Sequence, residues 1–278
     1  MDAISYFQAV ILGIVEGLTE FLPVSSTGHL TITEKILGLQ VDDKGVTAYT
    51  AIIQMGAILA VVLFFRRDIV LIARGWFSGL AHPEHRGTLE HRMGWYVIVG
   101  SIPLGLVGFA LRHVIQDHLR SLWVVAAGLI LWSAVIVYAE RAARQQRHER
   151  DLTMRDSIVV GLVQCFSLVP GVSRSGATIS AGLLRDLDRV TATRFAFLLG
   201  IPALFAAGLY ELKDVGGHGI GVGQIVVGLV ISFVVAYASV AWLLRFVAGH
   251  PLTWFVPYRV LLGLVLVALL ATGVLTAT

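Results

Sequence analysis

The sequence predicts an all-α polytopic membrane protein, and its composition and the length of its apolar runs are the main reasons. Of its 278 residues, 56% are hydrophobic and 14% are charged, and the mean hydropathy is +0.81. A soluble domain carries about 25% charged residues. Because a chain this apolar has too little polar surface to face water, lipid must surround much of its exterior.

Six apolar runs are long enough to cross a membrane as helices. A hydrocarbon core about 30 Å thick requires about 20 helical residues. The expected spans cover residues 46–65, 93–112, 121–139, 192–211, 222–247 and 254–276.

Two further segments, 5–38 and 156–185, are apolar but interrupted. The first contains Pro-Val-Ser-Ser-Thr-Gly at 23–28, and the second contains Pro-Gly-Val-Ser-Arg-Ser-Gly at 170–176. Proline and glycine weaken helical hydrogen bonding, and nearby hydroxyls can satisfy the freed backbone groups. We therefore expect each segment to form a re-entrant hairpin of two half-helices.

The two interrupted segments also resemble each other, since residues 13–28 align without a gap on 161–176. Each is followed by three expected spans, which predicts two repeats, 1–145 and 156–278. Because three is an odd number, the second repeat should be inverted relative to the first, as in many transporters. The hairpins would then enter from opposite faces, and their tips could meet near the midplane.

The distribution of arginine predicts the orientation in the membrane. Basic residues concentrate in 66–92, in 140–155 and at Arg245, whereas the loops near 113–120 and 212–220 contain fewer. Such a bias marks the cytoplasmic face, so both termini and the mouth of the first hairpin should face outward. The net charge of +3 thus fits a membrane topology and not nucleic-acid binding.

Glu16 and Glu20 are the first candidates for chemistry. Their i, i+4 spacing places them on one helix face, where like charges repel. Ionisable groups at membrane depth are costly and indicate function. The alternative is that both glutamates lie in water beyond the membrane edge.

Hydroxyl groups and a histidine follow these glutamates. Ser25, Ser26 and Thr27 could simply cap the second half-helix. The same helix N-terminus could also bind an anion through its free N–H groups. His29 could activate an alcohol or act as a nucleophile, and the alternative is a structural histidine.

Arg174, in the second interruption, keeps its charge under ordinary conditions and needs an anion if it is buried. That anion could be a phosphate, which its planar group binds in bidentate fashion, or a glutamate of the first hairpin. Two acids, a histidine, an arginine and several hydroxyls suit phosphoryl chemistry. The candidate phosphate ligands are Ser25, Thr27, Ser173, Arg174, Ser175 and Thr178.

A transporter or lipid flippase is the main alternative, because inverted repeats with broken helices are typical of transporters. The Glu16–Glu20–His29 set argues for an enzyme, since a carrier of an anionic head group has little use for two acids. A purely structural subunit would gain no stability from so many buried ionisable groups.

The stretches EGLTEFLPVSSTGH and PGVSRSGATI resemble the undecaprenyl-diphosphatase family of bacteria, also called bacitracin-resistance proteins. The resemblance implies a phosphatase of the bacterial inner membrane with its active site open to the outer face. Its substrate would be undecaprenyl diphosphate, cleaved to undecaprenyl phosphate and inorganic phosphate. This reaction would recycle the lipid carrier for peptidoglycan synthesis, and overproduction of the enzyme would confer bacitracin resistance.

The resemblance also implies residue roles. It assigns Glu16 and Glu20 to the glutamate-rich motif and Arg174 to phosphate binding. The family's need for a divalent cation, Mg²⁺ or Ca²⁺, points to the same two glutamates, although they could instead orient His29. Whether the protein forms a homodimer stays open.

These expectations combine into one mechanistic hypothesis. Arg174 and the half-helix N-termini bind the diphosphate while the polyprenyl tail stays in lipid. Ser26, activated by His29, attacks the terminal phosphorus. Glu20 orients His29 or handles protons, and Glu16 assists. In a variant of this scheme, His29 is the nucleophile.

Overall fold

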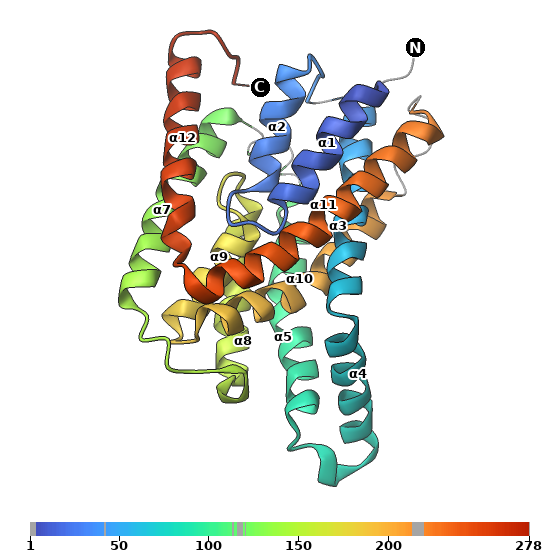
Figure 1. Ribbon diagram of the computed structural model, residues 1–278, viewed down its shortest axis with the longest axis vertical. Coiled ribbons are helices and arrows are strands. Elements are labelled where there is room, and N and C mark those ends of the chain that lie inside the picture. The colour runs from blue at the N-terminus through green and yellow to red at the C-terminus, as the bar shows by residue number, and fades with distance from the viewer. Residues whose placement is uncertain are drawn as a thin grey trace.

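The protein is all-helical in the part described by the computed structural model, which covers residues 4–41, 43–112, 114–115, 119, 121–212 and 220–277. Within these ranges there are eleven α-helices and no β-strand (Figure 1). The helices are α1 Tyr6–Thr19, α2 Ser26–Ile36, α3 Lys44–Phe64, α4 Arg66–Ala81, α5 Leu89–Ala110, α7 Leu122–Ala142, α8 Met154–Gln164, α9 Arg174–Leu184, α10 Arg189–Leu212, α11 Val222–Gly249 and α12 Val256–Ala271.

Among the described residues, six helices are long and apolar enough to cross a membrane, and they correspond to the six predicted spans. They are α3, α5, α7, α10, α11 and the stretch Leu252–Ala271, which includes α12. Many large apolar side chains on these helices are exposed, including Leu106, Phe109, Leu131 and Leu261. Because such a surface is stable only in an apolar solvent, the protein is a multi-pass membrane protein.

The last span is shorter than the sequence predicted. The expected run reached residue 276, but α12 ends at Ala271. Gly273 has a φ of 73°, in the left-handed region, and glycine in this conformation commonly ends a helix. Hydropathy could not reveal this end, because the residues beyond it are also apolar.

The two interrupted segments each form two short helices around a turn, α1 with α2 and α8 with α9. Helices of 14 and 11 residues extend only about 21 and 16 Å, which is too short to cross the hydrocarbon core. Ser25 and Ser173 precede α2 and α9 with φ values of 78° and 76°. The two turns therefore share an unusual backbone conformation as well as a sequence pattern.

The basic stretch 66–92 differs from the expected loop, because most of it is helical. Helix α4 continues α3 after the single non-helical residue Phe65 and packs along α5, so that the pair projects from one end of the molecule (Figure 1). Ile69 and Ile72 of α4 pack against the hydrophobic core. The arginines of this stretch made it resemble a polar loop, so the amphipathic pattern of α4 was not recognised. The expected loops near 113–120 and 212–220 lie mostly outside the described residues.

A charged network holds the two ends of the second hairpin together. Asp156, fully buried at the start of α8, accepts hydrogen bonds from Arg147 at 3.0 and 2.6 Å and from Arg185 at 2.7 Å. Burial acts to raise the pKa of Asp156, but hydrogen bonds from Arg147, Thr153 and Arg185 outweigh it and hold the pKa well below its ordinary value. The carboxylate therefore stays charged and links both hairpin ends to the segment before α8.

The first hairpin is held by close helix packing. Helix α1 runs along α11, and α11 also packs on α3. A Cβ atom at Gly17 would lie 2.6 Å from the carbonyl oxygen of Ser232, so only glycine permits this approach. Small residues at such contacts let membrane helices gain van der Waals packing. This packing holds α1 in a fixed position, together with Glu16 on the helix and Glu20 at its C-cap.

Candidate active site

The tips of the two hairpins meet and are joined by hydrogen bonds from their serines. Ser25 Oγ accepts a hydrogen bond from the Gly171 N–H at 3.1 Å. In the reverse direction, Ser175 Oγ donates to the Leu22 carbonyl at 2.9 Å, and Ser173 Oγ lies 3.0 Å from Ser175 Oγ. These three serines, predicted as phosphate ligands, are therefore engaged in joining the two turns.

Arg174 and Glu20 form an ion pair between the hairpins. Arg174 Nη2 lies 2.9 Å from Glu20 Oε1, and the two side chains are 13% and 5% exposed. Arg174 Nη1 also donates to the Gly200 carbonyl of α10 at 3.3 Å. Of the two anions that the sequence left open for Arg174, the structure contains the glutamate. The guanidinium keeps further N–H donors that this glutamate does not use.

Ser26 lies against the other oxygen of the same carboxylate. Its hydroxyl donates to Glu20 Oε2 at 2.5 Å. Glu20 therefore bridges the hydroxyl of one hairpin and the arginine of the other. Since a carboxylate within hydrogen-bonding distance can accept the serine proton, Ser26 has the environment of an activated nucleophile.

The N-terminus of α2 is available to an anion. Ser25, at its N-cap position, makes no capping bond with its side chain, because the hydroxyl faces the second hairpin. The first N–H groups of a helix have no intrahelical acceptor. By contrast, Ser173 caps α9 by accepting from the Gly176 N–H at 3.2 Å. The two similar turns thus differ. The N-terminus of α9 is capped by a side chain, whereas the N-terminus of α2 is uncapped and could bind an anion.

Glu16 lies one turn before Glu20 on α1 and is only 1% exposed. Its Oε1 atom has no hydrogen-bond partner among the described residues. A buried carboxylate oxygen without a partner is costly. Glu16, which lines the cavity described below, therefore has a carboxylate oxygen that could bind a ligand.

His29 is turned away from the serine that it was predicted to activate. Its Nδ1 lies 2.7 Å from the Ser25 carbonyl, and its Nε2 lies 2.6 Å from the Tyr258 hydroxyl. The Tyr258 ring stacks on the histidine ring at a centroid distance of 5.6 Å. Because the carbonyl can only accept, Nδ1 carries the proton and Nε2 accepts from tyrosine. The contacts of Ser26 therefore favour Glu20 as its base.

The remaining two predicted ligands are placed differently from each other. Thr178 is 1% exposed, and its hydroxyl donates to the Arg174 carbonyl within α9 at 2.8 Å. This bond is a common helical back-bond, so the side chain does not face the site. Thr27 is exposed and lines the cavity described next.

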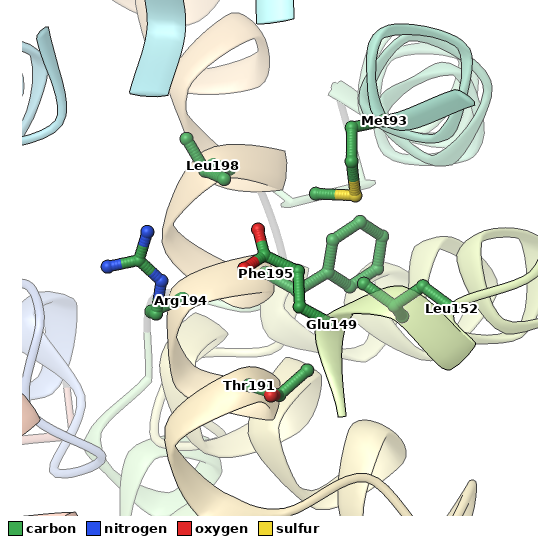
Figure 2. Close-up of a pocket in the computed structure, with 7 residues that line it drawn as sticks. All are labelled: Met93, Glu149, Leu152, Thr191, Arg194, Phe195 and Leu198. Carbon is green, nitrogen blue, oxygen red and sulfur yellow. The ribbon is translucent and has the colours of Figure 1, made fainter. Parts of the chain in front are cut away.

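A polar cavity of about 210 Å³ opens beside Glu16 and Ser26. Its walls come from α1, α2, α3 and α7 and from the second hairpin turn. The lining residues are Glu16, Ser26, Thr27, Leu30, Thr31, Glu34, Val41, Thr47, Thr50, Ala51, Gln54, Val125 and Pro170. A much smaller cavity of about 10 Å³ lies elsewhere, between α5, α10 and the segment before α8 (Figure 2), and contains none of the predicted site residues.

Two residues near the site were missed by the sequence reasoning, Tyr258 and Arg259 at the start of α12. Tyr258 contacts His29, and Arg259 is completely buried beside both hairpin turns. Arg259 had a recognisable signal, since an arginine inside an apolar span indicates a functional position. Tyr258 had none, because tyrosine is common near the ends of membrane helices.

The fold and the site thus define a class: multi-pass membrane proteins in which two broken-helix hairpins assemble a buried serine–glutamate–arginine site. The family described as "Bacitracin resistance protein BacA" matches residues 9–265, and the chain belongs to this family.

Similar proteins extend over nearly the whole chain. The undecaprenyl-diphosphatase of Acidothermus cellulolyticus is 57% identical over 97% of this chain and 98% of its own length. Undecaprenyl-diphosphatase 1 of Streptomyces avermitilis is 52% identical over 99% of this chain and 100% of its own length. The undecaprenyl-diphosphatase of Mycolicibacterium smegmatis is 50% identical over 98% of this chain and 99% of its own length. The family resemblance of the two motifs is therefore confirmed.

Proposed function

We propose that this protein is an undecaprenyl-diphosphatase of the bacterial membrane, and that it confers bacitracin resistance by this activity. It hydrolyses undecaprenyl diphosphate to undecaprenyl phosphate and inorganic phosphate. The family membership and the names of its relatives support this function. The observation that carries it is the Glu20 carboxylate, which bridges the Ser26 hydroxyl and the Arg174 guanidinium.

The reaction begins with the polyprenyl tail in lipid and the diphosphate in the cavity. Arg174 and the N–H groups of α2 bind the terminal phosphate. Glu20 takes the hydroxyl proton of Ser26 while the Ser26 Oγ bonds to the terminal phosphorus. The bond from this phosphorus to the leaving undecaprenyl phosphate breaks. Water then cleaves the Ser26 phosphate ester and releases inorganic phosphate. In this scheme Glu20 replaces His29 as the base, because Glu20 is the group that contacts Ser26.

A divalent cation fits the acidic side of the site. The unpartnered Oε1 of Glu16 is the hard oxygen ligand that Mg²⁺ or Ca²⁺ takes. The described residues contain no group of three or more His, Cys, Asp or Glu that could hold an ion without substrate. Mg²⁺, which often binds one or two carboxylates and substrate phosphates, suits this set better than Ca²⁺. Glu16 and Glu20 would hold the ion, and its charge would offset that of the diphosphate.

We infer that residues 1–145 and 156–278 are inverted repeats and that the site opens to the outer face. The matching turn conformations at Ser25 and Ser173 support a repeat. The start of α1 and the end of α12 lie at one end of the molecule, away from the α4–α5 projection (Figure 1), as expected if each repeat crosses the membrane three times. A C-terminal reporter that works only in the cytoplasm should stay silent, and an active one would overturn this orientation.

The function is tested by phosphate release from undecaprenyl diphosphate, with purified protein in detergent and Mg²⁺. Wild type should release phosphate, whereas Glu20→Gln and Arg174→Ala should not. Glu84→Gln, at an exposed position in the α4–α5 connection, serves as a charge-matched control and should behave as wild type. Failure of well-folded wild type to release phosphate would favour the flippase alternative, and lipid-flipping assays would follow.

The covalent step is tested separately with terminally labelled substrate and rapid quenching. Label on Ser26 supports the proposed nucleophile, and label on His29 supports the variant in which the histidine attacks. Label on neither residue, despite turnover, would indicate direct attack by water.

A further inference from the structure

Arg259 is an arginine without any exposed surface in the first turn of α12. It is the largest fully buried side chain among the residues that the structure describes. Within the described residues, no carboxylate lies within ion-pair distance of its guanidinium, whereas Arg174 has Glu20. A buried charge without a counter-ion is expensive. Such a charge persists only when other contacts, or a function, compensate for its cost.

The contacts of Arg259 include carbonyl oxygens of both hairpin turns. Nη1 donates to the Pro23 carbonyl at 2.8 Å. Nη2 donates to the Gly171 carbonyl at 2.9 Å and lies 3.2 Å from the Val172 carbonyl. Nε donates to the Ser133 hydroxyl of α7 at 3.1 Å. One rigid planar group thus binds the first hairpin, the second hairpin and a membrane-spanning helix.

The positions of these carbonyls explain why an arginine is needed. Both turns break their helices, so their carbonyl groups have no helical N–H partners, and lipid supplies no donors. The guanidinium offers five N–H donors in a fixed planar arrangement. A lysine has the same charge but is a flexible point donor that cannot hold two separate carbonyls in one geometry.

Each bonded carbonyl precedes a residue of the proposed site by the same number of positions in the sequence. Pro23 precedes Ser26 by three residues, and Gly171 precedes Arg174 by three residues. Ser26 and Arg174 are the two groups that Glu20 bridges. The planar group of Arg259 therefore sets the distance between the turn that carries the nucleophile and the turn that carries the phosphate-binding arginine.

We propose that Arg259 is a positioning residue for phosphoryl transfer, which fixes the two hairpin turns relative to each other without touching the substrate. This role rests on the proposed function above. It predicts that kcat depends on the shape of the residue and not on its charge alone. It also predicts that both turns loosen together when Arg259 is changed.

The test compares Arg259→Lys with wild type and with Arg245→Lys, an exposed arginine on α11. Since a displacement of about 1 Å at a reacting centre can cost about 100-fold, kcat should fall about 30- to 100-fold in Arg259→Lys. KM should change by less than about threefold, because Arg174 still binds phosphate. Arg245→Lys should match wild type.

Hydrogen exchange supplies a measurement that does not depend on activity. In Arg259→Lys, peptides covering 20–28 and 168–176 should both exchange faster, while peptides of α4 and α5 should not change. Unaltered kcat, or faster exchange in one turn alone, would overturn the proposal. If wild type itself releases no phosphate, the proposed function fails, and the exchange data still decide whether Arg259 joins the turns.

A second pair of variants covers the case in which Arg259→Lys does not fold. Ser133→Ala removes the acceptor of Nε, and Ser175→Ala removes the hydrogen bond to the Leu22 carbonyl. Each should lower kcat several-fold, and the double variant should lose less than the product of the two losses, because both act on one geometry. Normal kcat and normal exchange in Ser133→Ala would refute the proposal.

Discussion

Replacing Glu20 with glutamine removes the base and the counter-ion of Arg174 in one nearly isosteric change. In the wild type, Glu20 accepts from Ser26 at 2.5 Å and pairs with Arg174 at 2.9 Å. The amide cannot take a proton from the serine. A general base contributes about 10²- to 10⁴-fold to a rate, which corresponds to about 3–5 kcal/mol of barrier at 1.36 kcal/mol per tenfold.

The same change also affects stability. The Arg174 side chain is only 13% exposed, and removing one partner of a buried ion pair costs about 3–5 kcal/mol. The amide oxygen of glutamine can still accept one hydrogen bond from Arg174, so the loss of folding free energy should be about 3 kcal/mol or less. Glu20→Gln should therefore remain folded in detergent with a lower melting temperature.

The assay is single-turnover phosphate release at saturating substrate, with thermal unfolding measured on the same samples. Ser26→Ala should lose as much activity as Glu20→Gln, and the double variant should lose little more, because the two residues act as a unit. Retention of more than about a tenth of the wild-type rate in a folded Glu20→Gln sample would refute this role for Glu20. Multiplicative losses in the double variant would refute the coupling.

Three further predictions concern the surroundings of the site. Tyr258→Phe removes the hydrogen bond to His29 Nε2, worth about 1 kcal/mol, and should destabilise the protein by about that amount in thermal unfolding, whereas Tyr138→Phe on an exposed surface of α7 should have no effect. Gly17→Ala brings a Cβ atom to 2.6 Å from the Ser232 carbonyl and should destabilise the protein by about 1–3 kcal/mol in thermal unfolding. Asp156→Asn weakens the network at the second hairpin and should cost about 3 kcal/mol. Because the folded-state pKa of Asp156 is lowered, its stabilisation is present above its unfolded pKa near 4 and is lost as the pH falls below it; an acid unfolding curve unchanged in Asp156→Asn would contradict this.

Hydropathy and local motifs were sufficient to predict the spans, the two broken segments and several of the residues that meet at the candidate site. Membrane helices satisfy their backbone hydrogen bonds within one segment, so apolar length alone predicts them. Glu16, Glu20 and Arg174 were identified because an ionisable group inside an apolar run is costly wherever it lies. The sequence by itself therefore determined the class of the protein and predicted most of the polar groups that meet at the candidate site.

Only the tertiary structure decided which partner each polar group takes. Ser25 and Ser175 could have bound phosphate, but each bonds to the opposite hairpin, more than 140 residues away in the chain. His29 could have faced Ser26, yet it contacts Tyr258 of the last helix. These choices depend on how distant helices pack and not on local spacing, because a hydrogen bond forms only between groups that the whole fold brings to within about 3 Å.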